Sequence, residues 1–380
     1  MSTVDANPPS LPTARTPVLT SRLPKAGTTI FTVMSALAAG SGAGNLGQGF
    51  PDFDPDPALP AHVADAMREG LNQYPPMPGV PLLRERIADK IAALYGRRYD
   101  HGSEVTVTAG ATQAILTAVL AVVHPGDEVV VLEPTYDSYA PNIELAGGRV
   151  VRVPLTPRTR LVMINTPHNP SATVWTRDEM QRLAELLAPT DALLLADEVY
   201  EHMVFDGAPH VSASSFPALA ARAFVVSSFG KTYHVTGWKV GYVAAPAPLT
   251  AEFRKVHQFN VFTVNTPMQH ALARYMADPA PYLGLPAFYQ RKRDLFLEGL
   301  RATRLRPLHT QGSYFQLVDY RAVSSLPEAE FCQWLTREVG VAAIPVAAFY
   351  DGGFEQGLAR LCFAKRDETL HEALQRLRRL

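Results

Sequence analysis

Cysteine is scarce in this sequence, which contains only Cys332 and Cys362 among its 380 residues. Two cysteines are too few for a disulfide framework or a thiolate zinc site, so we expect no such metal centre and two small buried thiols. An excess of charge of one sign is also lacking, because 35 basic residues oppose 36 acidic ones and the net charge is -1. Such a balance provides no field that would attract nucleic acid or an anionic membrane, and we expect neither as a partner.

Long apolar runs are absent as well, and no stretch of the sequence approaches the roughly 18 continuous apolar residues that a membrane span requires. The segment Met1–Pro24 is rich in proline, serine and threonine and lacks the apolar centre of a signal peptide. We expect this segment to be a flexible arm. Together with the low cysteine content, these features predict a soluble, cytoplasmic protein.

The apolar content is sufficient for a large core, since 47% of the residues are hydrophobic. Domains usually contain roughly 100–200 residues, so a chain of 380 residues predicts two domains. We predict an N-terminal arm and small-domain segment over 1–45, a large domain over 46–280 and a small C-terminal domain over 281–380.

From about Val105 onward, short β-branched runs alternate with helical patterns. The expected strands are Val105–Thr108, Glu128–Leu132, Arg149–Val153, Leu161–Asn165, Ala192–Ala196 and Phe224–Ser227, and the expected helices are Gly110–Val123 and Thr176–Leu187. This alternation predicts an α/β fold with a mostly parallel sheet that helices cover on both faces. One connection is unusual, because about seven residues separate Val153 from Leu161 whereas a parallel crossover needs about a dozen. Either these strands are not parallel neighbours, or the chain lacks a helical connection there.

Beyond Pro248 the pattern becomes helical and then mixed. Helices are expected at Leu249–Gln258, Pro267–Met276, Pro286–Thr303, Glu328–Val339 and Glu368–Arg379, and strands at Tyr314–Val318, Ala342–Ile344 and Arg360–Phe363. This α+β pattern predicts the separate small domain, which we expect the N-terminal segment to join.

A lysine directly follows one predicted strand, in the segment S-S-F-G-K-T-Y that covers 227–233. Lysine is suited to Schiff-base chemistry, because its amine can lose a proton and attack a carbonyl. Lys231 also lies at the carboxyl end of a strand, where α/β folds bind ligands. Taken alone, such a lysine is more often a solvated loop residue, so the interpretation depends on the other motifs.

Two polar residues occur where other apolar strands end. A carboxylate at Asp197 is costly unless it pairs with a cation or a fixed dipole. A protonated pyridine nitrogen is a suitable partner, and capping of the following helix is an equally good alternative. Asn169, in the segment N-T-P-H-N-P, can donate to a ring oxygen or a carboxylate, or can serve only the turn.

Candidate anion-binding groups occur at several places. The segment Gly110-Ala111-Thr112 places backbone N–H groups and a hydroxyl at a helix N-terminus, which attracts phosphate. Lys239 and the hydroxyl of Ser228 can reach the same phosphate. Arg360 is a charge within an apolar strand, and arginine matches a carboxylate such as that of an amino acid bidentately. An internal salt bridge is the structural alternative for Arg360.

With these motifs in order, the chain resembles the fold-type I, class I/II aminotransferases that depend on pyridoxal 5'-phosphate (PLP), over about Leu23–Leu380. The blocks S-S-F-G-K-T, T-G-W-K-V-G, N-T-P-H-N-P and A-D-E-V-Y are together highly specific. Within the family, the chain is most similar to the bacterial methionine aminotransferases and next to kynurenine aminotransferase/glutamine transaminase K. The resemblance implies a three-layer, aspartate aminotransferase-like large domain that binds PLP, with a smaller α+β domain.

The resemblance also implies roles for individual residues. Lys231 would form the Schiff base with PLP and then move the proton of the substrate Cα, while Asp197 would pair with the pyridinium nitrogen. Asn169 and the catalytic Tyr200 would bind the phenolic oxygen of the ring, and Tyr136 would stack on the ring. The phosphate would be held by Gly110, Ala111, Thr112, Ser228, Lys239 and Tyr74. The substrate would be held by Arg360, Asn169, Gly49, Phe31, Tyr74 and Phe262.

Because Tyr74 and Phe262 would come from the neighbouring protomer, the resemblance implies a homodimer with shared active sites. It implies ping-pong transfer of the amino group of methionine, or of another apolar or aromatic amino acid, to a 2-oxo acid. Two positions depart from relatives, which carry a longer connection at Pro154–Arg160 and, in kynurenine-acting members, can have histidine at Thr263.

Other functions share this scaffold. A PLP carbon–sulfur β-lyase and a kynurenine- or glutamine-type transaminase would use most of the same residues. A non-catalytic PLP-fold ligand sensor would carry a basic helix-turn-helix domain, for which the first stretch of about 25 residues is too short and too rich in proline. Because the chemical motifs are complete, the sequence favours an aminotransferase over these alternatives.

Overall fold

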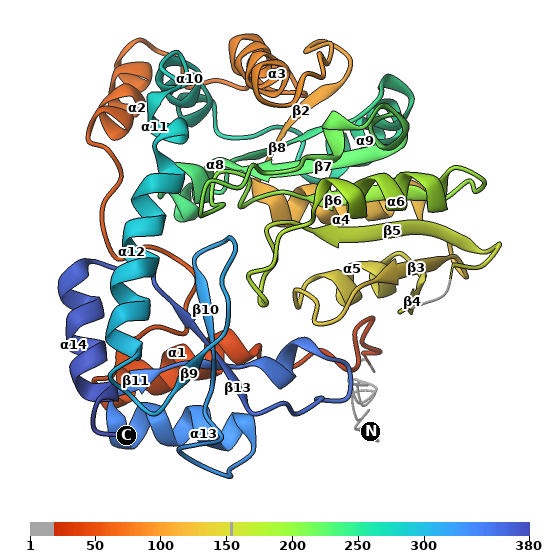
Figure 1. The fold of residues 1–380 in the computed structure, drawn as a ribbon. Helices are drawn as coiled ribbons and strands as arrows, with labels where there is room; N and C mark the ends of the chain where they lie inside the picture. Colours follow the sequence, from red (N-terminus) through yellow and green to blue (C-terminus); the bar gives the residue numbers. More distant parts are fainter. Residues whose placement is uncertain (1–18, 153–154) are drawn as a thin grey trace, which may run out of the picture.

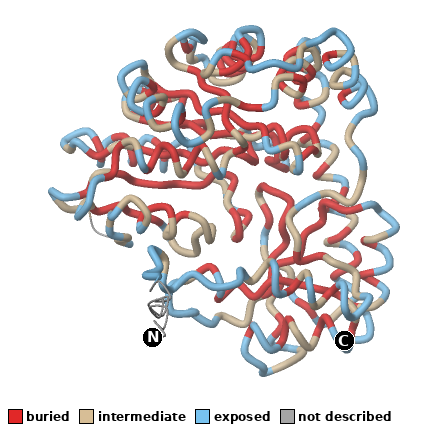
Figure 2. The backbone as a smooth tube through the Cα atoms, turned by 180° about the vertical axis from the view of Figure 1, so that it is seen from behind, coloured by how far each residue is buried: buried red, intermediate tan, exposed pale blue. Residues whose placement is uncertain are grey.

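The computed structural model describes residues 19–152 and 155–380, which form two layered parts, each built around a sheet (Figure 1). Most of the predicted arm Met1–Pro24 lies outside the described residues, and so does the predicted end of one strand at Val153. The central strands of the larger part are buried along most of their length, whereas connections that lead into them, such as residues 124–127 and 188–191, are mostly exposed (Figure 2).

The larger part contains a seven-stranded sheet in the order β2-β8-β7-β6-β5-β3-β4. Its strands are β2 (Val105–Thr108), β3 (Glu128–Val131), β4 (Arg149–Val151), β5 (Thr159–Asn165), β6 (Leu193–Asp197), β7 (Ala223–Ser228) and β8 (Gly241–Ala244). All neighbouring pairs are parallel except the two that β8 makes with β2 and β7. The prediction of a mostly parallel sheet is confirmed, although the sequence pattern did not predict β8.

Alternate side chains of these strands pack against helices on opposite faces of the sheet. The helices on one face are α4 (Gly110–Val122), α5 (Tyr139–Leu145) and α9 (Ala247–Asn260), and those on the other are α6 (Arg177–Leu187) and α7 (Pro217–Ala220). On β5, Leu161 and Met163 join the first core, whereas Val162 and Ile164 join the second. Because successive side chains of a strand point to opposite faces, a strand covered on both sides is apolar at every position.

A third core covers the edge of the sheet that β2 and β8 form. The helices there are α2 (Ala58–Arg68), α3 (Pro81–Tyr95), α10 (Thr266–Tyr275) and α11 (Ala280–Leu283). Leu83 and Ile87 of α3 pack with Val105 and Val107 of β2 in this core.

The short connection after β4 does not join neighbouring strands. β3 lies between β4 and β5 and pairs with both in parallel, which agrees with the first of the two explanations for the connection's length. β4 has only three residues, so it extends for roughly 10 Å at 3.3 Å per residue and a short return reaches the start of β5.

The smaller part combines a four-stranded antiparallel sheet, in the order β12-β13-β10-β9, with a short parallel pair, β1-β11. Its strands are β1 (Gly44–Asn45), β9 (Arg306–Pro307), β10 (Phe315–Asp319), β11 (Val341–Ala342), β12 (Ile344–Pro345) and β13 (Leu358–Cys362). Its helices are α1 (Ile30–Ser41), α12 (Leu285–Leu300), α13 (Glu328–Trp334) and α14 (Asp367–Leu377). Met34 of α1, Phe296 of α12 and Leu370 of α14 share one core, so the two ends of the described chain lie in the same part. The domain limits near residues 45 and 280 stay a prediction.

Two predicted elements of the smaller part differ from the structure. The strand expected over Ala342–Ile344 is divided, because β11 pairs with β1 whereas β12 pairs with β13, and the chain changes partner at Ala343. The helix expected over Glu328–Val339 begins as α13 and ends in π-helical turns over Leu335–Val339.

Two expectations from composition can be compared with the described residues. Cys332 and Cys362 are buried free thiols, as predicted. Over residues 19–152 and 155–380, no helix combines the length and the apolar character needed to cross a membrane.

Candidate active site

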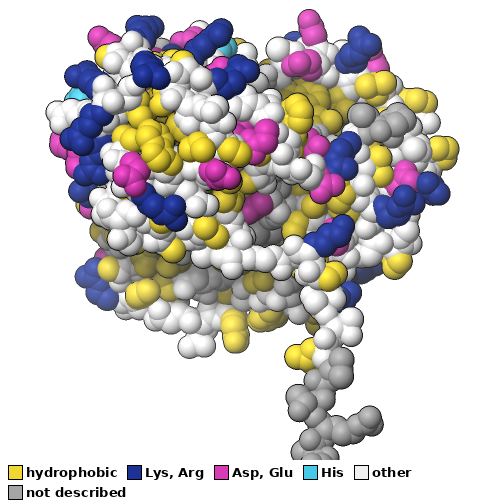
Figure 3. Space-filling model, turned by 90° about the horizontal axis from the view of Figure 1, so that it is seen from below, with side chains coloured by type: hydrophobic (Ala, Val, Ile, Leu, Met, Phe, Trp, Pro, Cys, Tyr) yellow, Lys and Arg dark blue, Asp and Glu magenta, His cyan; other side chains and the backbone are white. Residues whose placement is uncertain are grey.

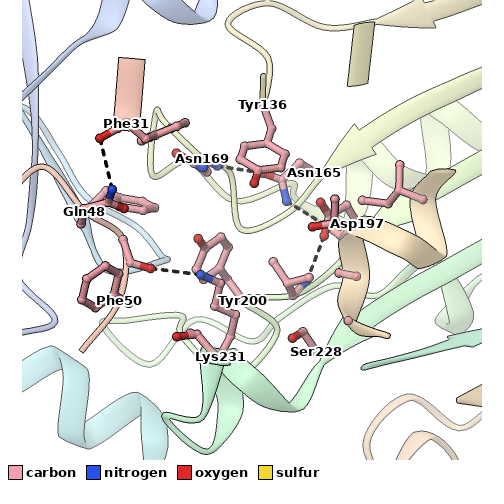
Figure 4. A pocket seen from close by; sticks show the side chains of 18 of the residues that line it. Phe31, Gln48, Phe50, Tyr136, Asn165, Asn169, Asp197, Tyr200, Ser228 and Lys231 are labelled. Carbon is pink, nitrogen blue, oxygen red and sulfur yellow. Dashed lines mark hydrogen bonds between the residues drawn. The ribbon is translucent and has the colours of Figure 1, made fainter. Parts of the chain in front are cut away.

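A cavity of about 370 Å³ lies at the carboxyl ends of the parallel strands, where the two parts of the molecule meet (Figure 4). Thirteen of the residues singled out from the sequence line it: Phe31, Gly49, Gly110, Ala111, Thr112, Tyr136, Asn169, Asp197, Tyr200, Ser228, Lys231, Lys239 and Arg360. They come from α1, the start of α4, the ends of β6 and β7, β13, and the connections that follow β1, β3, β5, β6 and β7, so segments distant in sequence meet there.

Tyr74 and Phe262 do not line this cavity. Tyr74 is 81% exposed and Phe262 is 44% exposed, and their rings contact each other edge to face with centroids 5.3 Å apart. Exposed aromatic side chains that contact each other form an apolar patch, and such patches often mark a surface that binds another protein. The position of this pair is therefore compatible with the predicted homodimer.

Lys231 lies in the single-turn helix α8 (Phe229–Thr232), directly after β7 and thus at the carboxyl end of a strand, as predicted. Its Nζ donates to Tyr314 Oη at 2.7 Å and to the Gly49 carbonyl at 3.1 Å. Burial lowers the pKa of Lys231 to about 8 from its usual 10.5, and the neighbouring charge of Arg360 acts in the same direction. The neutral amine that a nucleophile or a base requires is therefore far more abundant near neutral pH than in an ordinary lysine, while the protonated form still predominates.

Asp197 is a buried acid at the end of β6 that has no ion-pair partner among the described residues. Tyr139 Oη donates to its Oδ2 at 2.6 Å, and the Val199 N–H donates to its Oδ1 at 3.3 Å. Burial raises the pKa of Asp197 to about 6, although both hydrogen bonds oppose this shift. A carboxylate held in this way at a cavity wall fits a cationic ring nitrogen of a ligand.

A second group of residues that lines the cavity is suited to an anion. Gly110, Ala111 and Thr112 line the cavity at the N-terminus of α4, where the first backbone N–H groups of a helix have no partner within the helix. A Cβ at Gly110 would lie 3.5 Å from Lys239 Nζ, which shows how closely the cation approaches this turn. Ser228 and Thr236 add hydroxyls to the same wall. The set fits a phosphate group.

Arg360 is completely buried in β13, yet it has no acidic partner among the described residues. Its Nη1 donates to Asn169 Oδ1 at 2.6 Å and its Nη2 donates to the Gly47 carbonyl at 2.8 Å, while Nε has no partner in the described part. Its guanidinium lies 3.9 Å from the ring centroid of Phe315. The internal salt bridge considered from the sequence is therefore absent from the described residues, and the group fits a ligand carboxylate.

Some residues of this site were not singled out from the sequence. Tyr139 and Asn165 support the ring-binding wall, because Asn165 donates to the Asp197 carbonyl at 2.8 Å and accepts from the Asn169 N–H at 2.8 Å. Asn165 stands within the quoted segment N-T-P-H-N-P, so its polar character at the end of an apolar strand was an available signal. Tyr314 gave no such signal, since it begins an apolar strand and reads as core.

Comparison with known proteins agrees with this site. The model of the family "Aminotransferase class I and II" matches residues 43–377. The chain therefore belongs to the class I and II aminotransferases, which depend on PLP, and it is an aminotransferase. The cofactor fits the residues present, because an unpaired buried acid and a phosphate cradle line the same cavity.

Three relatives illustrate the similarity. The chain is 52% identical to methionine aminotransferase of Escherichia coli over 95% of its own length and 98% of the relative's. The crystal structure of that enzyme covers 96% of this chain and superposes with a TM-score of 0.94. A probable N-succinyldiaminopimelate aminotransferase of Mycobacterium tuberculosis is 40% identical over 94% of this chain and 97% of its own. Human kynurenine–oxoglutarate transaminase 1 is 34% identical over 88% and 92% respectively.

Proposed function

We propose that this aminotransferase takes the amino group from methionine, or from another apolar or aromatic amino acid, and passes it to a 2-oxo acid in a ping-pong cycle. The observation that carries this proposal is the environment of Arg360, whose guanidinium has no acidic partner in the described residues and lies beside the rings of Phe31 and Phe315. An α-carboxylate would bind Arg360 while an apolar side chain contacts the rings.

The charges of the cavity argue against an acidic side chain on the donor. Within the described part of the chain, the cations that line the cavity are Lys231, Lys239 and Arg360. Lys231 is needed for chemistry, Lys239 lies at the phosphate end, and Arg360 takes the α-carboxylate. A second substrate carboxylate would remain unpaired, which is costly in a desolvated site.

The bound PLP ring withdraws electrons and thereby acidifies the substrate Cα–H, while Asp197 keeps the ring nitrogen protonated. We assign the ring to the space between Tyr136 and Asp197, with Asn169 and Tyr200 at its phenolic oxygen. Gly110, Ala111, Thr112, Ser228 and Lys239 would hold the phosphate.

Lys231 is proposed to carry the proton. Its Nζ would accept the proton from the substrate Cα and return it at the cofactor carbon, since a neutral amine with a pKa of about 8 can both accept and release a proton near neutral pH. The burial of the surrounding side chains keeps bulk water from competing for that proton.

The site is proposed to be completed by a second copy of the chain. Tyr74 and Phe262 stand outside the cavity and are exposed, so they are available to reach the cavity of a partner. We propose a homodimer in which Tyr74 contributes to the phosphate site and Phe262 to the side-chain pocket of the neighbouring protomer. The cytoplasmic location expected from the sequence also stays a proposal.

The donor preference can be tested with the purified enzyme loaded with PLP. We expect kcat/KM with methionine or phenylalanine to exceed that with aspartate by about 100-fold or more, because an unpaired buried carboxylate is strongly disfavoured. Equal values for aspartate and methionine would refute the assignment of the side-chain pocket. Release of pyruvate and ammonia from cystathionine, faster than amino transfer from methionine, would instead indicate a carbon–sulfur β-lyase.

A further inference from the structure

The amine of Lys231 is held by two oxygen atoms outside the motifs that bind PLP. Its Nζ lies 2.7 Å from Tyr314 Oη and 3.1 Å from the Gly49 carbonyl oxygen. Tyr314 Oη in turn donates its own hydrogen to the Gly49 carbonyl. Because the hydroxyl hydrogen is directed to Gly49, a lone pair of the same oxygen faces the lysine amine. The lysine amine therefore donates to both oxygens while the tyrosine hydroxyl donates to the carbonyl, so each of the three hydrogen bonds has a defined direction.

Tyr314 is rigidly placed. It is completely buried immediately before β10, and its ring packs edge to face on Tyr200 with centroids 5.1 Å apart. Burial raises the pKa of Tyr314 well above its ordinary value, so its phenol stays neutral and keeps the hydrogen that it donates. Gly49 is equally constrained, because a Cβ at this position would lie 2.7 Å from the Phe315 ring. The two acceptors of the lysine amine thus have little freedom to move.

We propose that Tyr314 is a positioning residue for Lys231, holding the amine in place while the lysine carries the proton between the substrate and the cofactor. This inference rests on the proposed function of the site. A lysine side chain has four rotatable carbons, and an amine that must accept a proton from one particular atom loses rate when its position is spread over several rotamers. Tyr314 limits the rotamers that Lys231 can adopt through its hydrogen bond with the amine, although Tyr314 is not one of the residues that line the cavity.

The contact also affects the charge of the amine. Both oxygens accept hydrogen bonds, and accepting groups favour the protonated form of a lysine. Loss of the Tyr314 hydroxyl should therefore lower the pKa of Lys231 further. Arg360, Asp197, Lys239 and Cys362 also act on this amine, and they are unchanged by a substitution at Tyr314.

The matched pair of variants is Tyr314→Phe and Tyr289→Phe. Tyr289 is also completely buried, and its ring lies 5.8 Å from that of Tyr314, but its hydroxyl has no hydrogen-bond partner in the described residues. Each variant removes one hydroxyl from the same aromatic cluster, and only Tyr314→Phe removes a contact with Lys231. Thermal midpoints and the visible band of bound PLP would show that both proteins are folded and loaded.

For Tyr314→Phe we expect kcat to fall about 10–100-fold while KM for methionine changes by less than about threefold, since placement of a proton carrier is affected and substrate binding is not. The kinetic isotope effect with Cα-deuterated methionine should increase, because proton transfer becomes slower than the other steps. Independently of turnover, competitive acetylation of Lys231 in the PLP-free protein, followed by peptide mass spectrometry against pH, should show a lower pKa. Tyr289→Phe should remain within about twofold of the wild type in kcat.

Two outcomes would overturn the proposal. An unchanged kcat, isotope effect and acetylation profile in Tyr314→Phe would show that Lys231 does not depend on this hydroxyl. Equal losses in Tyr314→Phe and Tyr289→Phe, without a change in the isotope effect, would show that the cluster serves only packing. Failure of the function itself would be distinguishable, because wild-type protein would then not transfer the amino group of methionine.

Discussion

At the scale of single residues, the site contains charges that the apoprotein stabilises poorly. Asp197 and Arg360 are both buried, and neither has an ion-pair partner in the described residues. Burial moves the pKa of Asp197 upward and that of Arg360 downward, in each case toward the neutral form. Such groups are expected where a ligand provides the missing charge, and they reduce the stability of the protein without the ligand.

Asp197→Asn should therefore stabilise the PLP-free protein in a pH-dependent way. The pKa of Asp197 rises from its usual 3.8 to about 6 in the folded chain, so its destabilising effect is absent below pH 4 and complete above pH 6. The effect is about 3 kcal/mol at most, since each pKa unit corresponds to about 1.4 kcal/mol. We expect the difference in the free energy of unfolding, variant minus wild type, to increase between pH 4 and pH 7. A difference that is constant over this range would contradict the account.

Most residues of the site could be predicted because each is chemically unusual for its position. A lysine after a strand, an acid at the end of an apolar strand and an arginine within another strand are visible in the sequence without any structure. Tyr314 could not be predicted in this way, because a tyrosine next to apolar residues is ordinary in a core. Its role depends on the approach of Gly49, which is 265 residues away along the chain.

At the scale of secondary-structure elements, a buried ion pair connects α3 to the segment after β6. Lys90 Nζ lies 2.6 Å from Glu201 Oε1, and the two side chains are 5% and 2% exposed. Glu201 also accepts from Tyr95 at 2.6 Å and from Ser227 at 2.5 Å. Since Ser227 precedes Ser228 and the helix that carries Lys231, the pair supports the strand end on which the lysine is mounted.

Lys90→Met should lower the free energy of unfolding by about 3–5 kcal/mol, because Glu201 would remain buried without its cation. The matched control is Arg68→Met, which removes an ion pair with Asp65 whose side chains are 73% and 46% exposed. That control should change stability by about 0.5 kcal/mol or less. Urea unfolding of both variants provides the measurement. Equal changes in the free energy of unfolding would show that burial does not increase the contribution of the Lys90 ion pair to stability.

Elements were predicted well where the local pattern decides them and less well where distant pairing does. The parallel strands β3, β5 and β6 have continuous apolar runs because helices cover both faces, so they were expected close to their observed ends. The division between β11 and β12 was not predicted, since it depends on which strand each half meets. β8 was missed because it follows the lysine motif without an intervening long helix.

At the scale of the whole molecule, positive and negative side chains are intermingled over the face seen from below the smaller part (Figure 3). This agrees with the near-zero net charge of the chain. Association with a second copy would therefore depend on the shape and apolar contacts of the interface rather than on long-range charge.

Mixed dimers test whether each site uses residues of both protomers. Chains with Lys231→Ala and chains with Tyr74→Ala, co-expressed with different tags and purified as mixed dimers, would contain one complete site. We expect about half of the wild-type activity per dimer, because the intact lysine then meets the intact partner tyrosine in one of two sites. The control is a mixed dimer of Lys231→Ala with Asp197→Ala. Lys231 and Asp197 line the same cavity of one chain, so each of the two sites in this dimer lacks one of them and the dimer should stay inactive. No activity in the first mixture would contradict the shared site.

The central claim is that Lys231 and its cavity carry out amino transfer from methionine with PLP. It is tested most directly by the visible absorption spectrum of the PLP-loaded protein before and after addition of methionine, in the absence of any 2-oxo acid. We predict that the band of the cofactor bonded to Lys231 disappears, that the shorter-wavelength band of the aminated cofactor replaces it, and that Lys231→Ala shows neither change. A band that persists while pyruvate or ammonia is released, or a wild-type protein that shows no band after addition of PLP, would contradict the account.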